Sequence, residues 1–121
     1  MNNSIVDKEL QQAQTNLIVA NYDLGKSLYN RAENKLVEAK KIFQDKSGMY
    51  EKLNEECNGL FRQSIPFFKD AIRLIDNMDD EGKVANCTNL RNCLDSLHTV
   101  YTHLEMYEEL KPIKHRIDEL L

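Results

Sequence analysis

The stretch of residues 61–75, FRQSIPFFKDAIRLI, constrains the fold more than any other part of the chain. Its apolar residues recur every three or four positions, so they lie along two neighbouring faces of one helix. The first face carries Phe61, Ile65, Phe68, Ile72 and Ile75, and the second carries Leu60, Ser64, Phe67, Ala71 and Leu74. A helix with so wide an apolar surface needs cover on two sides. We therefore predict a central helix that lies between two others.

Proline and glycine are scarce, with two and four among 121 residues, and 30% of the residues are charged. That composition is typical of long amphipathic helices joined by short connections. The length suits one domain. We predict an all-α fold over residues 1–121, in which four antiparallel helices form two stacked hairpins and the first hairpin is elongated.

The first helix should begin near Ser4, because Ser4 and Asp7 fit a capping box. Apolar residues then recur at steps of three and four through Leu10, Ala13, Leu17, Ala20, Leu24, Leu28, Ala32, Leu36, Ala39 and Phe43. These residues form one long, narrow apolar stripe. Gly25 marks either a close helix crossing or a bend, so the helix is either continuous or broken near residues 21–25.

The second helix should run over about 48–77, after a turn at residues 45–48 in which Ser47 is a candidate cap. Pro66 lies well inside its apolar pattern. A proline there removes one backbone hydrogen bond and crowds the preceding turn. We expect a kink at Pro66 and not the end of the helix.

The third helix should begin from about Lys83, with Asp79 or Asp80 as its cap. Its apolar residues continue in alternating steps of three and four to Leu104. A break at residues 105–106 then precedes a fourth, short helix that carries the second proline.

An internal similarity relates the second and fourth helices. A shift of 46 residues places Pro66 on Pro112, which are the two prolines of the chain. The same shift superimposes the apolar residues around them, for example Phe67 on Ile113 and Leu74 on Leu120. We infer that the two helices are equivalent parts of a duplicated helical hairpin.

Several short patterns carry a family resemblance. The first hairpin begins at Tyr22-Asp-Leu-Gly25, continues with Leu28 and Tyr29, and has the small, aromatic, small pattern of Ser64, Phe68 and Ala71 in its second helix. The second hairpin runs through Leu94, Leu97, Tyr101 and Leu104, turns at Glu105, and continues with Leu110, Ile113 and Ile117. These residues resemble the tetratricopeptide repeat, in particular the divergent C-terminal repeats of bacterial proteins of that family. The resemblance implies stacked hairpins in a right-handed superhelix.

The chain departs from that family in three places. Residues 32–58 are additional to a standard hairpin, and they extend both helices of the first hairpin by about 20 Å at 1.5 Å per residue. Glu105 stands where glycine is usual, and Leu110 stands where a small residue is usual. We divide the domain into the start of the first helix (1–18), the extended first hairpin (19–77) and the second hairpin (78–121).

The resemblance implies a non-catalytic adaptor or scaffold that mediates protein–protein interaction. Its binding groove for a protein or peptide would be lined by Val19, Tyr22, Lys26, Tyr29, Asn30, Asn92, Asp95, Thr99, Thr102 and His103. Tyrosine rings and amide groups suit peptide recognition. The alternative is a structural homo-oligomer. Its dimerisation arm would be the projecting end of the first hairpin, with Leu36, Ala39, Phe43, Tyr50 and Leu53 in contact.

Enzyme chemistry is not expected. His98 and His103 stand five residues apart, so they diverge on a helix where metal ligands would stand four apart. No glycine-rich phosphate loop and no nucleophile–base arrangement can be identified. We expect no catalytic residue, no metal site and no cofactor. Cys57, Cys87 and Cys93 share no CxxC spacing, and we expect them to be reduced and structural.

Charge and hydropathy set further expectations. The net charge of −4 gives no reason to bind nucleic acid or an anionic membrane. No apolar run approaches the roughly 18 residues that cross a bilayer, and the first residues lack the features of a signal peptide. We expect a cytoplasmic protein, or an exported one if a signal segment preceded these residues.

Overall fold

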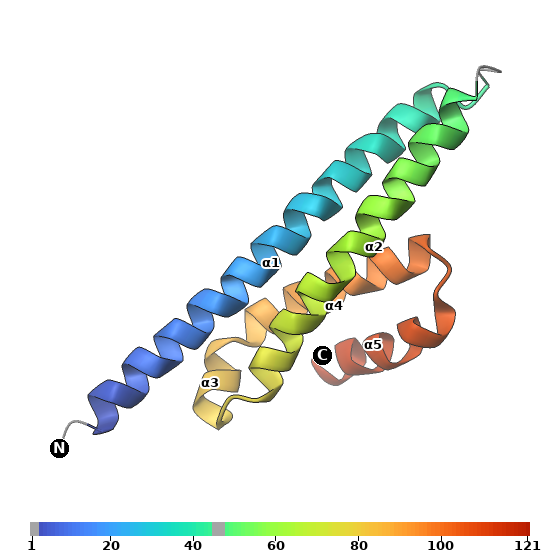
Figure 1. Cartoon of the computed structure of the whole chain (residues 1–121). Helices are drawn as coiled ribbons and strands as arrows, with labels where there is room; N and C mark the ends of the chain where they lie inside the picture. The colour runs from blue at the N-terminus through green and yellow to red at the C-terminus, as the bar shows by residue number, and fades with distance from the viewer. Residues whose placement is uncertain (1–2, 45–47) are drawn as a thin grey trace.

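The computed structural model describes residues 3–44 and 48–121, and the regular structure of these residues is helical. The helices are α1 (Asn3–Lys41), α2 (Met49–Asp76), α3 (Asp80–Ala85), α4 (Cys87–His103) and α5 (Tyr107–Glu119). α1 and α2 form a long antiparallel hairpin, and α4 and α5 form a shorter pair on one side of it (Figure 1). The all-α prediction and the elongated first hairpin are confirmed, but the described residues form five helices and not four.

α1 is one continuous helix through Gly25. This glycine lies where α1 and α2 come closest together, and it does not mark a bend. A Cβ atom built on Gly25 would lie 2.9 Å from Cε1 of Phe68, a side chain of α2 that is fully buried. Only a residue without a side chain allows the two helices to approach so closely. Of the two alternatives left open by the sequence, the structure selects the close crossing.

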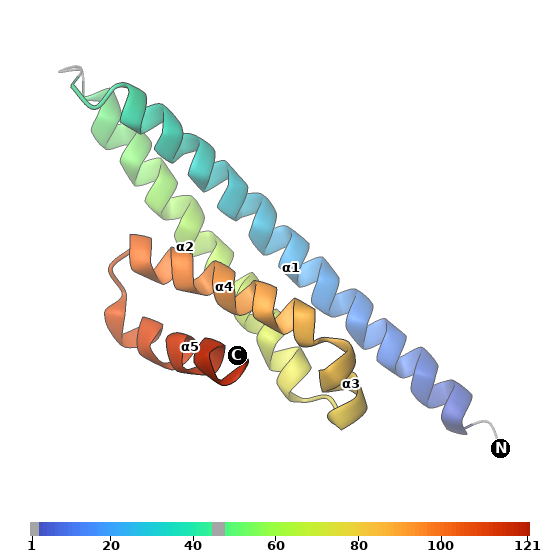
Figure 2. The same ribbon diagram turned by 180° about the vertical axis from the view of Figure 1, so that it is seen from behind.

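α2 packs along α1 on one side and against α4 on another, as the two apolar stripes of residues 61–75 predict. Seen from behind, α4 crosses the hairpin formed by α1 and α2 (Figure 2). Phe61, Phe68 and Ile75 are almost completely buried between these helices. The helix passes through Pro66 without ending, and Pro66 itself is exposed. Its N-cap is Gly48 with φ 83°, whereas the candidate cap Ser47 lies outside the described residues.

The first half of the α1 stripe lies at the surface. Leu10, Leu17 and Leu24 are 57%, 52% and 53% exposed, whereas Ile18 and Tyr29 are buried. Successive residues of an α-helix are rotated by about 100° about its axis. On this basis the buried face of α1 is centred on Gly25, against which Phe68 packs. The stripe from Leu10 to Leu24 lies about a third of a turn away from that face. The close crossing therefore decides which apolar face of α1 is buried.

The predicted third helix is also divided, because the chain turns at Asn86. Asp79 caps α3 as expected, with its Oδ1 accepting a hydrogen bond from the Gly82 N–H at 2.8 Å. Asn86 is fully buried, and its Nδ2 donates to Gly82 O and to Thr15 Oγ1 of α1, both at 3.1 Å. A buried amide must find such partners, and here they fix the end of α3, the start of α4 and a point on α1 together.

α4 ends in a Schellman motif that turns the chain into α5. The Met106 N–H donates to Tyr101 O at 2.9 Å, and the Glu105 N–H donates to Thr102 O at 3.2 Å. This motif requires a left-handed residue, and Glu105 has φ 58°. Glutamate therefore occupies a backbone conformation that favours glycine, at the break predicted for residues 105–106.

We expect Glu105→Gly to raise the free energy of unfolding by about 1 kcal/mol, because glycine removes the left-handed strain. Urea denaturation followed by circular dichroism measures the change. Glu105→Ala is the control: it removes the same charge but keeps a Cβ atom, so it should give little of this gain. Equal gains from both variants would contradict the explanation by backbone strain.

We expect Gly25→Ala to destabilise the fold by about 1–3 kcal/mol, because the new methyl group overlaps the buried Phe68 ring. Gly59→Ala in α2 is the matched control, since nothing lies within 4 Å of its Cβ position. There alanine should stabilise by about 0.5–1 kcal/mol through helix propensity. The same denaturation experiment compares the two, and a stabilising Gly25→Ala would refute the close crossing.

Candidate functional site

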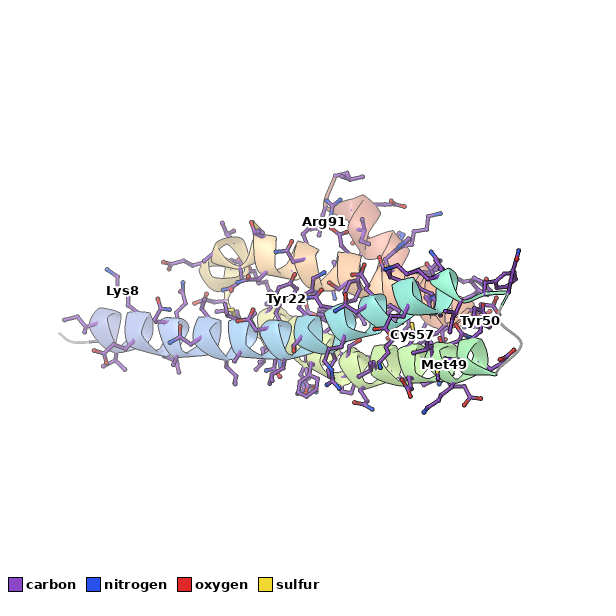
Figure 3. The ribbon with its side chains drawn as sticks, turned by 90° about the horizontal axis from the view of Figure 1, so that it is seen from above. Lys8, Tyr22, Met49, Tyr50, Cys57 and Arg91 are labelled. Atoms are coloured by element: carbon purple, nitrogen blue, oxygen red, sulfur yellow. The ribbon has the colours of Figure 1, made fainter. Side chains whose placement is uncertain are left out.

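Six of the ten predicted groove residues meet in a shallow groove of about 190 Å³ between α1 and α4. Its lining consists of Tyr22, Lys26, Tyr29, Asn92, Asp95 and Thr99, together with Ser96. Figure 3 shows Tyr22 where α1 faces α4. The two helices bring these residues together because the buried faces of both pack on α2 from adjacent directions.

The tyrosines of the groove belong largely to the core. Tyr29 is only 8% exposed, and its ring packs edge-on against Phe61 and Phe68 with centroids 5.5 and 6.4 Å apart. The Lys26 Nζ lies 3.9 Å from the centroid of the Tyr29 ring and covers it further. Burial, the largest cause, raises the pKa of Tyr22, so its phenol stays neutral and can donate a hydrogen bond. The rings therefore form the floor of the groove.

The polar rim of the groove is already partly paired. The single Nε–H of Arg91 donates a bifurcated hydrogen bond to the two carboxylate oxygens of Asp95, at 3.0 and 3.2 Å. Asn92 and Thr99 are exposed along the same edge of α4. The groove thus offers exposed amide and hydroxyl groups but little apolar surface.

The other four predicted groove residues lie elsewhere. Val19 and Asn30 are exposed on α1, and Thr102 Oγ1 donates to the carbonyl of His98 at 2.7 Å. His103 points toward α2, where its ring lies 4.9 Å from that of Phe61. The groove is therefore shorter than the sequence implies.

Sequence reasoning missed a cluster of Cys57, Asn58 and His103 between α2 and α4. The His103 Nε2 donates to Asn58 Oδ1 at 2.9 Å and lies 3.8 Å from Cys57 Sγ. A hollow of about 280 Å³ opens beside this histidine. These residue types occur together in thiol enzymes. No sequence signal pairs them, because 45 and 46 residues separate His103 from its two partners.

The surroundings of this cluster favour the neutral forms of Cys57 and His103, whereas an activated thiol needs surroundings that favour the thiolate. Cys57 is completely buried, and burial raises the pKa of its thiol. Burial, followed by the charge of Lys40, lowers the pKa of His103. Both shifts favour the neutral groups, whereas a catalytic pair needs a thiolate and an imidazolium. The arrangement suits packing and hydrogen bonding.

The predicted dimerisation arm uses most of its apolar side chains within the hairpin. Ala39 and Leu53 are buried, Leu36 is half-buried, and Phe43 packs edge-on against Tyr50 with centroids 5.2 Å apart. Of these five residues only Phe43 is exposed, at 64%.

A larger apolar surface lies on the first half of α1. We name it the outer stripe, and it consists of Val6, Leu10, Ala13, Leu17, Ala20 and Leu24, all of which are exposed. They are spaced alternately four and three residues apart, so the pattern repeats every seven residues. Each repeat has two apolar positions: the first holds Leu10, Leu17 or Leu24, and the second, three residues later, holds Ala13 or Ala20. Heptad spacing is the pattern by which one helix packs against another. The sequence showed this pattern, but not that the chain leaves it uncovered.

The outer stripe continues onto α2 along one flank of the hairpin. The ion pair between Lys35 Nζ and Glu56 Oε2, at 3.1 Å, marks this flank. The two helices are antiparallel, so moving from this ion pair toward the N-terminus of α1 means moving toward the C-terminus of α2. Eleven residues, or about three turns, from the pair are Leu24 in α1 and Phe67 in α2. Seven residues beyond these are Leu17 in α1 and Leu74 in α2. Phe67 and Leu74 are half-buried. By this count, Leu24 and Leu17 of α1 lie at the same levels along the hairpin as Phe67 and Leu74 of α2.

Neither a protein-family model nor a curated protein or solved structure matches the chain. Among residues 3–44 and 48–121 no cluster of histidine, cysteine and acidic residues could hold a metal ion. None of the helices described is both long and apolar enough to span a membrane. The cysteines carry no disulfide: Cys57 and Cys93 are buried and free, and Cys87 is exposed and free.

The lowered pKa of His103 predicts a pH dependence of stability. The unfolded chain takes up a proton near pH 6.5, before the folded chain does, so the free energy of unfolding should fall as the pH drops below that value. Denaturation at pH 7.5 and 5.5 measures the loss. His103→Gln keeps a polar group without the titration, so its loss should be smaller. Equal losses in both proteins would exclude His103 as the cause.

Proposed function

We propose that the chain is a non-catalytic protein that acts by binding another protein through the outer stripe. The observation that carries this proposal is the exposure of Leu10, Leu17 and Leu24, each more than half exposed along one face of α1. Single exposed leucines are common on protein surfaces, but a contiguous apolar strip is typical of interaction sites. Adaptor or scaffold function is also what the resemblance to tetratricopeptide repeats implies.

The spacing of the outer stripe favours a helix as the bound element. Apolar residues every 3.5 positions stay on one line only when two helices coil about each other. A ligand bound as an extended strand would require unpaired backbone groups at a sheet edge, whereas α1 uses its backbone groups within the helix. The outer stripe therefore suits a helix with its own leucine or alanine seam.

The α1–α4 groove is a second candidate surface, for an extended peptide. Its support is the meeting of Lys26, Asn92 and Thr99 at one rim, where amide, hydroxyl and ammonium groups could hold peptide carbonyls. It is small and offers few apolar anchors, so it would contribute less binding energy than the outer stripe.

Two observations favour a binding role over catalysis and over assembly through the hairpin end. Cys57, the thiol nearest to a histidine, is buried and has a raised pKa. Ala39 and Leu53 at the hairpin end are buried within the chain, so contact there would depend on the exposed Val37, Phe43 and Met49.

We expect a photo-crosslinking residue at Leu17 to give a covalent adduct with a protein in the cells that make the chain. Val37 is the control position, because it is in the same helix and equally exposed, at 51% against 52%, but on another face. Denaturing gels after irradiation should show a discrete adduct band for position 17 and none for position 37. The same bands at both positions, or none at either, would contradict the proposal.

A further inference from the structure

We propose that the helix bound to the outer stripe is the outer stripe of a second copy of this chain, running antiparallel, with the two-fold axis at the level of Thr15. The inference rests on the proposed function and names the partner. It would make the chain a symmetric dimer in which the two α1 helices lie side by side over residues 6–24. It differs from assembly through the hairpin end, because that end would project away from the axis in both copies.

The lengths of the two helices place the axis. The ion pair between Lys35 and Glu56 places these two residues at the same level of the hairpin. From Glu56, α2 continues for twenty residues to its last residue, Asp76. Twenty residues from Lys35 toward the N-terminus of α1 is Thr15. Both helices rise 1.5 Å per residue, so α2 ends at the level of Thr15. The residues of α1 before Thr15 thus run past the end of α2 (Figure 1), and one side of them, Leu10 included, borders residues 77–81 across a hollow of about 410 Å³. They carry Val6 and Leu10, 56% and 57% exposed.

A two-fold axis at Thr15 brings this overhanging part of one copy onto the uncovered part of the other. Val6 of one copy then lies opposite Leu24 of the second, Leu10 opposite Ala20, and Ala13 opposite Leu17. The overhang also lies at the level of Phe67 and Leu74 on α2 of the second copy. Two incompletely covered surfaces of the same chain therefore match in length and position under one symmetry operation.

The alternation of leucine and alanine favours the antiparallel direction. Antiparallel helices pair the first position of one heptad with the second position of the other, so Leu10 and Leu17 each meet an alanine. Facing large and small residues fill each layer evenly. A parallel pair would instead stack leucine on leucine and alanine on alanine, which leaves space at every alanine layer.

Charge and size limit the affinity. Glu9 and Asp23 lie on the same rim of the outer stripe, and in the antiparallel pair Glu9 of one copy comes beside Asp23 of the other. Like charges there oppose association and are screened by salt. The contact involves one face of residues 6–24 and the neighbouring Phe67 and Leu74 in each copy, which is fewer side chains than the roughly 20–30 of a standard stable interface. We therefore expect a reversible dimer that forms at micromolar concentration and above. A foreign helix with basic rims is the competing occupant.

Sedimentation of the full chain between 5 and 500 μM tests the proposal. The mass should rise from 14.1 kDa toward twice that value, and more readily at high salt. Leu17→Glu should weaken self-association at least tenfold, whereas Val37→Glu, equally exposed on another face, should leave it unchanged. Asp23→Lys should strengthen it several-fold, because each repulsive rim pair becomes an ion pair.

Disulfide trapping in a Cys87→Ser background tests the direction of the helices. Asn16 lies next to the axis, so Asn16→Cys should give a disulfide-linked dimer under mild oxidation. Ser27 follows the outer stripe, and in the proposed dimer its two copies are roughly 36 Å apart at 1.5 Å per residue. Ser27→Cys should therefore not be linked, whereas it would be in a parallel pair.

The outcomes separate this inference from the proposed function. A 14.1 kDa mass at 500 μM for both the natural chain and Asp23→Lys overturns the second copy as partner. If position 17 then still gives an adduct with a foreign protein, the outer stripe remains a binding surface with a different occupant. Self-association that Leu17→Glu does not weaken, or trapping through Ser27→Cys, also overturns the proposed dimer.

Discussion

The contact between Gly25 and Phe68 is the interaction on which the rest of the structure depends. The missing side chain at Gly25 admits the buried Phe68 ring, and the tyrosines one turn to either side of Gly25 pack against the same ring. This aromatic centre sets the register of α1 on α2 and the rotation of α1 about its own axis. Because interiors are closely packed, neither can change without displacing these rings.

The rotation of α1 has a direct consequence for function. A helix can turn only one face toward a given neighbour, and the face centred on Gly25 excludes the face that carries Leu10, Leu17 and Leu24. The chain thus contains two apolar faces on one helix and covers only one of them in its first half. The outer stripe remains at the surface as a consequence of the packing that stabilises the hairpin, which is why we place the binding function there.

Polar and backbone features position the second hairpin. Buried Asn86 joins α3, α4 and α1 through its amide, and the Schellman motif at Glu105 reverses the chain into α5. Arg116 of α5 then reaches Asp76 at the end of α2 with two hydrogen bonds of 2.8 and 3.0 Å. Of these contacts, the hydrogen bond from Asn86 to Thr15 ties the start of α4 to α1, and the shallow groove lined by Lys26 and Asn92 lies between the same two helices.

The sequence by itself determined the helices and most of their ends, because periodicity, caps and turn residues act within a few positions. The two stripes of residues 61–75, the cap at Asp79 and the turn at residues 105–106 are of this local kind. Only the tertiary structure decided that Asn86 divides the third helix, that His103 turns to Cys57, and that the first half of the α1 stripe stays exposed. Each of these depends on partners many residues away: Thr15 for Asn86, Asn58 for His103, and Phe68 for the rotation of α1. A pattern of apolar positions shows that a helix face seeks cover, but which face receives it depends on the fit of side chains between helices.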